Sequence, residues 1–245
     1  MKSKQVYLAW QAPDTRTWYV VGQLSESAGS YVFRYTHGAK KSEKFVPFSG
    51  MEDLTKTYNS IDLFPLFKNR LLSEKRPEYP TFIKWLSLDA QEVNPLDILA
   101  RSGGLRGTDQ LQTFKRIDLE KDLSFEHFFF VHGLRHLQSD AEERVNKLEV
   151  GEKLYLCLDC QNDHDKDAVL IRADSPTQIV GYCPRYLAAD INKLLLSKES
   201  KVELTVEMLS NDAPINYKLM CKLSGQMSES DRSLFMANKE YLPLT

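Results

Sequence analysis

Short stretches in which apolar and polar residues alternate recur along this chain and limit the folds it can adopt. Alternation with a period of two predicts half-buried strands, because successive side chains of a strand point to opposite faces. The clearest stretch is 202–208, where Val202, Leu204 and Val206 alternate with polar or charged residues. The spacing of a helix replaces this alternation in only a few places. We therefore expect an α+β fold of short strands with helices inserted between them.

The first unit is expected at residues 1–120. A three-stranded meander should open it, with strands at Val6–Trp10, Trp18–Leu24 and Tyr31–Tyr35. Helical spacing follows over 63–72 and 82–86. Asn94-Pro95 predicts the cap and first residue of a further helix, which Gly103-Gly104 should end. A strand near Gln112–Ile117 would complete this unit.

A charged segment over 115–124 separates this region from a second expected unit at 124–224, and residues 225–245 are expected to form a tail or a short helix. The strands of the second unit are predicted at Glu126–Val131, Lys153–Asp159, Ala168–Arg172, Gln178–Tyr182, 202–208 and 217–223. Ser139-Asp140-Ala141-Glu142 has the spacing of a capping box and predicts one helix, and Pro184 predicts the start of another. Because closure removes exposed sheet edges, the pattern favours a small closed barrel.

Composition restricts the class of function. A net charge of −2 over 245 residues argues against a globally basic nucleic-acid binder, so any contact with nucleic acid must be local. The sequence contains no apolar run of membrane-spanning length. The apolar run Val6–Trp10 is too short for a signal peptide, so we expect a cytoplasmic protein without membrane contact.

Two spacings are compatible with metal ions, but neither is the favoured interpretation. Cys157 and Cys160 have the spacing of a zinc pair, yet residues three apart on a strand point to opposite faces. Ordinary reduced strand thiols are favoured, as for Cys183 and Cys221. The acidic series at 163, 165 and 167 has calcium-loop spacing, but Ala168 stands where such a loop needs glycine. We expect no metal and no cofactor.

Several polar segments permit a structural and a functional interpretation. Residues 162–167 can be a solvated turn, since Asn and Asp bond their own backbone, or a binding loop. We expect a solvated helix end rather than a nucleic-acid contact at the basic residues Lys68, Arg70, Lys75 and Arg76. His127 and His132 are expected to be core or surface residues rather than ligands. Residues 102–107 are expected to be a helix-ending turn rather than an anion nest. No phosphate loop or nucleophile elbow is present, so a non-enzymatic protein is expected.

Three motifs in the second unit resemble the HIRAN domain, a module of chromatin-remodelling ATPases and of bacterial and phage proteins. They are the strand end Phe130-Val131-x-Gly133, the loop Asn162-x-His164-Asp165-x-Asp167-Ala168-Val169, and Gly181-Tyr182-x-Pro184-Arg185. The resemblance covers roughly 127–223 and implies an OB-like barrel that captures the 3′ end of single-stranded DNA and contacts its terminal hydroxyl. It also favours a bacterial or phage origin.

The resemblance assigns roles to individual residues. Arg135 matches a phosphate-contacting arginine, and His136 stands where an aromatic ring stacks on the terminal base. Asn162 and Asp165 match end-reading positions, with His164 in place of a tyrosine. The further candidates are Tyr182 as a contacting ring and Lys166 and Arg185 as additional phosphate contacts. Asp163 departs from the family, which commonly has proline there.

The N-terminal region resembles more loosely the N-terminal subdomain of HipA-type kinases of toxin–antitoxin systems. The similarity rests on Trp18–Leu24, Val32–Tyr35 and Leu63–Leu72, and no kinase core follows. It implies a protein partner bound by this region. The competing hypothesis is therefore a regulator or antitoxin-like partner of a HipA-like kinase, with no DNA binding. A nuclease is a third possibility that would require a metal cluster.

Overall fold

The chain forms two compact units in a computed structural model that describes residues 4–197 and 199–245. Unit 1 comprises Met1–Arg116 and Asn238–Thr245, and unit 2 comprises Ile117–Ala237. Residues 1–3 of the expected first unit lie outside the described residues. The segment expected as a tail, 225–245, is divided between the two units, because its last eight residues belong to unit 1.

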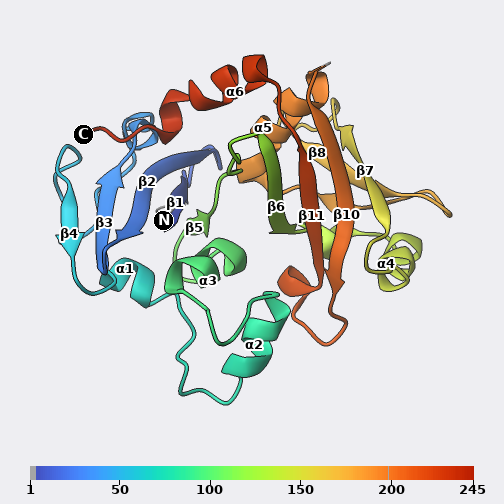
Figure 1. Cartoon of the computed structure of the whole chain (residues 1–245), viewed down its shortest axis with the longest axis horizontal. Helices are drawn as coiled ribbons and strands as arrows, with labels where there is room; N and C mark the ends of the chain where they lie inside the picture. The colour runs from blue at the N-terminus through green and yellow to red at the C-terminus, as the bar shows by residue number, and fades with distance from the viewer. Residues whose placement is uncertain (1–3, 198) are drawn as a thin grey trace. The chain divides into compact units, whose positions relative to one another are not determined.

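Unit 1 contains a five-stranded antiparallel sheet in the order β4-β3-β2-β1-β5 (Figure 1). Its strands are β1 (Lys4–Gln11), β2 (Trp18–Ser27), β3 (Ser30–Tyr35), β4 (Tyr58–Ser60) and β5 (Leu111–Phe114). The predicted meander and the closing strand are confirmed, and only the three-residue β4 was missed. Leu8, Leu24 and Phe33 are fully buried in the core of this unit.

The helices of unit 1 are short. They are α1 (Pro65–Lys68), α2 (Tyr79–Trp85) and α3 (Pro95–Ser102), with a 3-10 turn at His37–Lys40. The Asn94 side chain accepts a hydrogen bond from Leu96 N, and Gly103 (φ 75°) ends α3 in the left-handed conformation, so both predicted signals for α3 are confirmed. Residues 102–104 are thus the predicted helix-ending turn.

The helix predicted over 63–72 is formed only over Pro65–Lys68, and Arg70 in the chain just after it has a structural role. Its guanidinium is buried, forms two hydrogen bonds to the Asp109 carboxylate and donates to Gly104 O, while its Nε donates to Leu66 O. The expectation that Arg70 belongs to a solvated basic helix end was therefore wrong. This residue instead ties the chain after α1 to the loop before β5.

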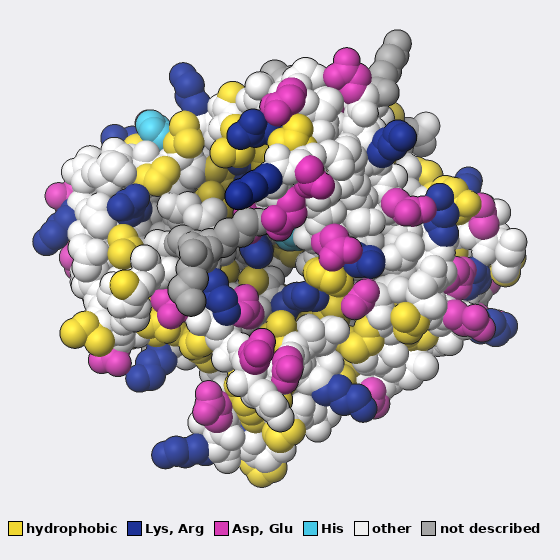
Figure 2. Space-filling view, in the orientation of Figure 1, with side chains coloured by type: hydrophobic (Ala, Val, Ile, Leu, Met, Phe, Trp, Pro, Cys, Tyr) yellow, Lys and Arg dark blue, Asp and Glu magenta, His cyan; other side chains and the backbone are white. Residues whose placement is uncertain are grey.

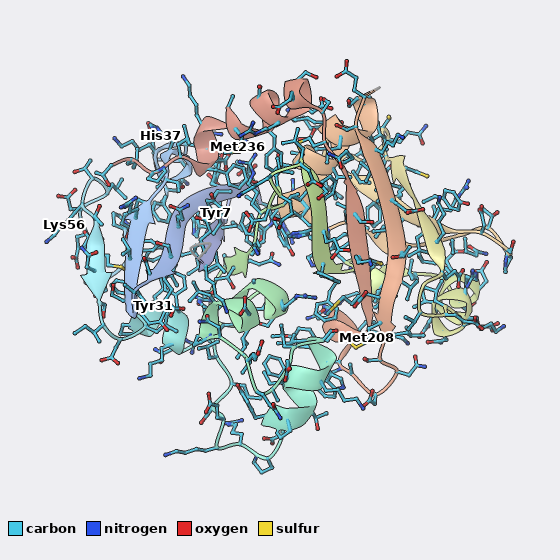
Figure 3. The ribbon with its side chains drawn as sticks, viewed as in Figure 1. Tyr7, Tyr31, His37, Lys56, Met208 and Met236 are labelled. Atoms are coloured by element: carbon cyan, nitrogen blue, oxygen red, sulfur yellow. The ribbon has the colours of Figure 1, made fainter. Side chains whose placement is uncertain are left out.

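The last eight residues pack on the sheet of unit 1. The Tyr241 ring meets the Tyr7 ring edge-on with centroids 5.0 Å apart, and Figure 3 marks Tyr7 on β1. The Arg116 guanidinium lies 4.1 Å from the centroid of the Tyr241 ring. Glu240 accepts a hydrogen bond from Val20 N and pairs with Lys41. These contacts explain why the C-terminal segment is part of unit 1 rather than a free tail.

Unit 2 contains a six-stranded antiparallel sheet in the order β6-β11-β10-β7-β8-β9. The strands are β6 (Ser124–Phe130), β7 (Lys153–Leu158), β8 (Val169–Ala173), β9 (Gln178–Tyr182), β10 (Lys201–Leu209) and β11 (Leu219–Gln226). All six agree with the predicted strands to within about three residues at each end. β6, β11 and β10 lie side by side in Figure 1.

The closed barrel expected for unit 2 is not formed by the described residues. Strands β6 and β9 remain the two edges of an open sheet. The chain just after β6 pairs with β9 in one isolated antiparallel bridge, in which His132 and Tyr182 exchange two backbone hydrogen bonds of 2.9 Å. One bridge is too little pairing to close the sheet. The expectation of an OB-like barrel is therefore corrected to an open, curled sheet whose edges touch at one point.

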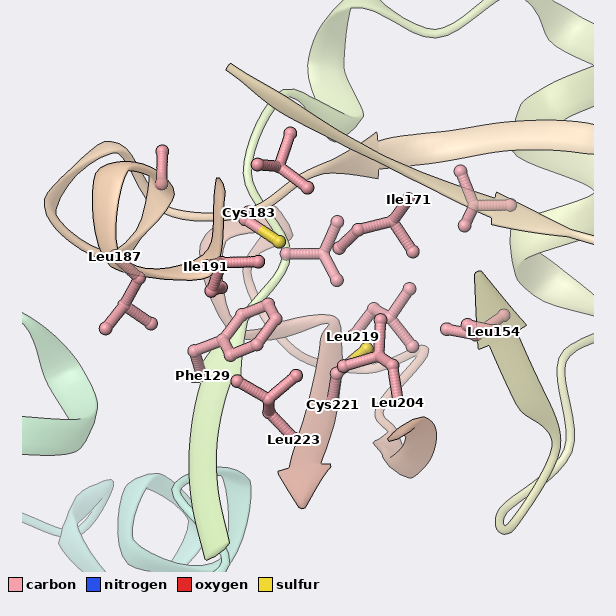
Figure 4. Close-up of a cluster of buried hydrophobic side chains, with 14 of the residues drawn as sticks. Phe129, Leu154, Ile171, Cys183, Leu187, Ile191, Leu204, Leu219, Cys221 and Leu223 are labelled. Atoms are coloured by element: carbon pink, nitrogen blue, oxygen red, sulfur yellow. The ribbon is translucent and has the colours of Figure 1, made fainter. Parts of the chain in front are cut away.

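Helices cover the sheet of unit 2: α4 (Ser139–Asn146), α5 (Arg185–Leu196) and α6 (Glu229–Met236), with 3-10 turns at Leu134–His136 and Ile215–Tyr217. The predicted helices at 139 and after Pro184 are confirmed. The capping box is not, because the cap of α4 is Gln138 and makes no side-chain cap bond. The core includes Leu187 and Ile191 of α5, packed with Phe129, Ile171 and Leu204 of the sheet (Figure 4).

No helix within residues 4–197 and 199–245 combines the length and the apolar character needed to cross a lipid bilayer.

Candidate nucleic-acid interface

A bulge in β9 determines where the Tyr182 side chain points. The register between β8 and β9 shifts next to Ile171, so that Val180 and Gly181 both stand opposite one residue. Gly181 has φ 137°, and a Cβ there would lie 2.3 Å from Val131 Cγ1 and 2.7 Å from His132 O. Only glycine, which has no Cβ, can occupy this position. As a result Tyr182 pairs with Leu170 and points away from the core.

Tyr182, Asp159 and Asn162 form one hydrogen-bonded group. The Tyr182 hydroxyl donates to Asp159 Oδ2 at 3.1 Å, and Asn162 Nδ2 donates to the same oxygen at 3.0 Å. Burial and the neighbouring Asp159 carboxylate raise the pKa of Tyr182 above its ordinary value, so the phenol is protonated at neutral pH. The group therefore has a carboxylate at its centre and two donors directed at it.

The loop after Asp159 is held by its own side chains. Asn162 Oδ1 accepts hydrogen bonds from the backbone N–H groups of His164 and Asp165, at 3.0 and 2.9 Å. Asp165 Oδ1 accepts from Asp167 N at 3.0 Å. The turn interpretation is thus correct for the backbone, because Asn and Asp replace backbone acceptors here. The same bonds fix the directions of the Asn162 and Asp165 side chains.

Arg185, the first residue of α5, connects this loop to the helix. Its Nε lies 3.2 Å from Asp165 Oδ2, and its Nη2 donates to His164 O at 2.6 Å. Both Asp165 oxygens therefore already take part in interactions, while each keeps a further lone pair. A positive and a negative group consequently lie side by side at the start of α5.

The turn at 133–136 lies against the Tyr182 ring. Gly133 has φ 81°, and a Cβ on it would be 3.2 Å from Tyr182 Cδ2. Arg135 follows two residues later, but its exposed side chain donates to Asn216 Oδ1 at 3.2 Å rather than to the Tyr182 group. The side chain of His136 is exposed. The turn approaches the site, yet these two candidate side chains are not bonded to its other members.

The structure thus joins Asn162, Asp165, Tyr182 and Arg185 through short contacts, and His164 through its backbone. Lys166 is in the same loop with an exposed side chain. Sequence reasoning missed Asp159, which is the acceptor shared by Tyr182 and Asn162. Its position just after β7, three residues before Asn162, could have indicated this contact, because a polar residue at the end of a strand can reach into the loop that follows.

His132 lies beside the same group and is uncharged at neutral pH. It is partly buried, and its ring centroid is 6.4 Å from that of Tyr186 in an edge-on arrangement. Burial lowers the pKa of His132 to about 4, because the charged imidazolium would lose hydration. His132 therefore contributes no positive charge to a phosphate at pH 7.

The described residues contain no group of three or more His, Cys, Asp or Glu side chains arranged to hold a metal ion. Cys157 is partly buried on β7, Cys160 is exposed, and all four cysteines are free thiols. In the acidic series, Asp165 turns one oxygen to the Asp167 N–H and the other to Arg185. These oxygens stabilise the loop itself.

Charge is mixed on the surface. On the face drawn in Figure 2, Lys and Arg side chains are interspersed with Asp and Glu side chains. This distribution agrees with the net charge of −2. Recognition of a polyanion on such a surface must depend on a few positioned groups rather than on a broad positive field.

Comparison with known proteins identifies the second unit. The model of the HIRAN domain matches residues 124–228. The HIRAN domain of human HLTF, in its crystal structure, is 19% identical, with a TM-score of 0.36 over 50% of this chain and 92% of that one. A crystal structure of a Lactobacillus plantarum protein is 18% identical, with a TM-score of 0.33 over 42% of this chain and 99% of that one. No curated protein matches the chain. Residues 124–228 of this chain are therefore a HIRAN domain.

Proposed function

We propose that the HIRAN domain binds the 3′-hydroxyl end of single-stranded DNA and that the protein is a non-enzymatic adaptor. The observation that supports this most directly is the group of Asp159, Asn162, Asp165, Tyr182 and Arg185, which gathers carboxylate acceptors beside a ring and a guanidinium. The family match supports DNA as the ligand. The group lies on a loop between two strands and at the start of a helix, which fixes its geometry.

The chemistry of a strand end fits this arrangement. A free 3′-hydroxyl is a donor, and a carboxylate accepts from it in a charge-assisted bond worth about 1.5–3 kcal/mol. The same carboxylates repel a terminal 3′-phosphate. Internal phosphates are repelled as well unless a cation is close, and Arg185 supplies one 3.2 Å from Asp165. The neighbouring Asp165 carboxylate and Arg185 guanidinium thus favour a DNA end with a free hydroxyl over the internal sugar-phosphate backbone.

Each proposed residue has a separate task. Asp165 accepts from the hydroxyl, while Asn162 and Asp159 hold the loop and the Tyr182 phenol in position. Arg185 contacts the last internal phosphate. Arg135, His136, His164 and Lys166 remain proposed contacts, and the exposed position of each side chain leaves it accessible to a strand.

A titration of short fluorescent oligonucleotides tests the proposal. We expect the native protein to bind a 3′-hydroxyl strand at least tenfold more tightly than the same strand with a 3′-phosphate. Asp165→Asn should reduce this preference about tenfold, because it removes the charge from the acceptor. The matched control is Asp163→Asn, since Asp163 is exposed in the same loop. Equal affinity of the native protein for both ends would refute end recognition.

The competing function, a regulatory protein that binds a HipA-like kinase through unit 1, predicts a different result. In that case both oligonucleotides bind weakly and equally, and a kinase is recovered with the full chain in a pull-down. Stability of the oligonucleotide in magnesium or manganese tests the remaining alternative, a nuclease. Degradation that depends on the metal would contradict the proposal that the protein is not an enzyme.

A further inference from the structure

The outer face of β7, β8 and β9 carries an ordered set of side chains that the proposed end site does not use. Residues paired across antiparallel strands share a face, and residues two apart on one strand do so too. Tyr155 pairs with Arg172, which pairs with Ile179. Cys157 pairs with Leu170, which pairs with Tyr182. The two rows therefore lie on one face, and the second row ends at the proposed site.

The first row is exposed and has aromatic and cationic character. Tyr155 is 38% exposed and Ile179 is 45% exposed. The Arg172 guanidinium lies 5.0 Å from the centre of the Tyr155 ring, and its Nη2 is 3.1 Å from Asp174 Oδ1. The guanidinium and the ring thus form a cation–π contact on the surface of the sheet. We refer to Tyr155, Arg172 and Ile179 as the outer row.

On this face, the exposed apolar and aromatic side chains are replaced by charged ones at the boundary with β10. The opposite face of the same strands is core, where Val169, Ile171 and Val180 are fully buried. On the other side of the outer row, Lys153 pairs with Glu203 of β10 at 3.0 Å, which is the usual composition of a solvated sheet surface. Among the described residues, the exposed large apolar and aromatic side chains on the strands of this sheet are Tyr155 and Ile179, which lie in the part that leads to Asp159.

We propose that the outer row is a stacking platform for nucleotides upstream of the captured 3′ end. This proposal rests on the proposed function, because the strand end must first lie at the Tyr182 group. The platform supplies what single-stranded nucleic acid needs: an exposed ring for a base and a guanidinium for a phosphate or a second base. Such contacts are tolerant of sequence, since every base has a flat face.

Distances along β7 limit the number of nucleotides that the platform can hold. Tyr155 precedes Asp159 by four residues, and a strand rises about 3.3 Å per residue, so the two positions are about 13 Å apart. Stacked nucleotides rise about 3.4 Å each, so this span corresponds to at most about four nucleotides. Affinity should therefore increase with strand length from two nucleotides to about five and then level off.

The test compares oligonucleotides of two and six nucleotides, each made with a 3′-hydroxyl and with a 3′-phosphate and carrying a fluorophore at the 5′ end, on the full chain. We expect the native protein to bind the longer strand about tenfold more tightly, as for one base stacked on an aromatic ring. Tyr155→Ala should remove this gain and leave binding of the dinucleotide unchanged. Tyr155→Phe should keep it, because the ring remains. Val150→Ala, at a side chain 72% exposed in the turn before β7, is the matched control.

The outcomes separate this inference from the proposed function. A preference for the 3′-hydroxyl with equal affinity for both lengths would overturn the platform alone. A length gain that survives in Tyr155→Ala would also overturn it, because the strand then follows another path. Loss of the preference for the 3′-hydroxyl would remove the proposed function and the platform with it. A full chain that binds neither length has the same consequence and favours a protein ligand.

Discussion

The neutral, partly buried His132 should make unit 2 sensitive to mild acid. Its pKa is about 4 in the folded protein, against an ordinary value of 6.5. Between these values the unfolded chain binds the proton and the folded protein does not, so the free energy of unfolding falls as the pH is lowered. The stability is fully present above about pH 7 and decreases through the window from 6.5 to 4.

The two pKa values determine the magnitude. Linkage gives a loss of about 2 kcal/mol between pH 7.5 and pH 5, approaching about 3 kcal/mol below pH 4. Other groups titrate as well, so the relevant quantity is the difference between the native protein and His132→Gln. The backbone bonds of residue 132 to Tyr182 do not involve the side chain, and they should persist in the variant.

The assay must report on unit 2. All three tryptophans, Trp10, Trp18 and Trp85, belong to unit 1, so tryptophan fluorescence follows the wrong unit. Native-state hydrogen exchange of the β8 amides, corrected for intrinsic rates, measures the unfolding free energy of unit 2. We expect the loss on acidification to be about 2 kcal/mol smaller in His132→Gln than in the native protein.

The control is the same substitution at the exposed His164, which tests whether replacing another histidine of unit 2 changes the measured loss. Identical losses in the native protein and in His132→Gln would refute the reasoning. That result would mean that the imidazole is hydrated well enough in the folded protein to accept its proton.

Two further substitutions test structural roles. Arg70→Ala should destabilise unit 1 by about 2–3 kcal/mol, because it leaves two carbonyls without their buried donor and Asp109 without its ion pair; urea unfolding followed by tryptophan fluorescence measures this. Lys68→Ala, at an exposed position, should change stability by less than about 0.5 kcal/mol, and a similar loss in both variants would contradict the assigned role of Arg70. Gly181→Ala should destabilise unit 2 by about 2–4 kcal/mol in hydrogen exchange, since it combines a left-handed φ with a 2.3 Å approach to Val131; a loss below about 1 kcal/mol would mean that the bulge adapts easily.

Local pattern was sufficient for most secondary structure. The alternation of Val202, Leu204 and Val206 predicted β10, and the Asn94-Pro95 and Gly103 signals predicted both ends of α3. The helix predicted over 63–72 is formed only over Pro65–Lys68. Apolar spacing there is helical, but the Arg70 side chain bonds to Gly104 and Asp109, more than thirty residues away in the sequence. No local signal reports such a contact.

The candidate site was predictable in part. The polar loop and Tyr182 stand out because Asn, Asp and an aromatic residue occur where strands end. Asp159 was missed because its importance comes from Tyr182, which lies 23 residues later and is turned toward it by the bulge at Gly181. Arg135 was grouped with the loop by its place in the motif, whereas its side chain bonds to Asn216.

The sequence by itself determined all strands but β4, the helices α3, α4 and α5, and the polar loop, because these depend on periodicity and turn chemistry within a few residues of one another. Only the tertiary structure decided that the second sheet stays open, that the last eight residues pack on unit 1, and which side chains meet around Asp159. The physical reason is the sequence separation of the interacting residues. Edge pairing, ring packing and ion pairs join residues far apart in the chain, and these contacts form only when the core packs.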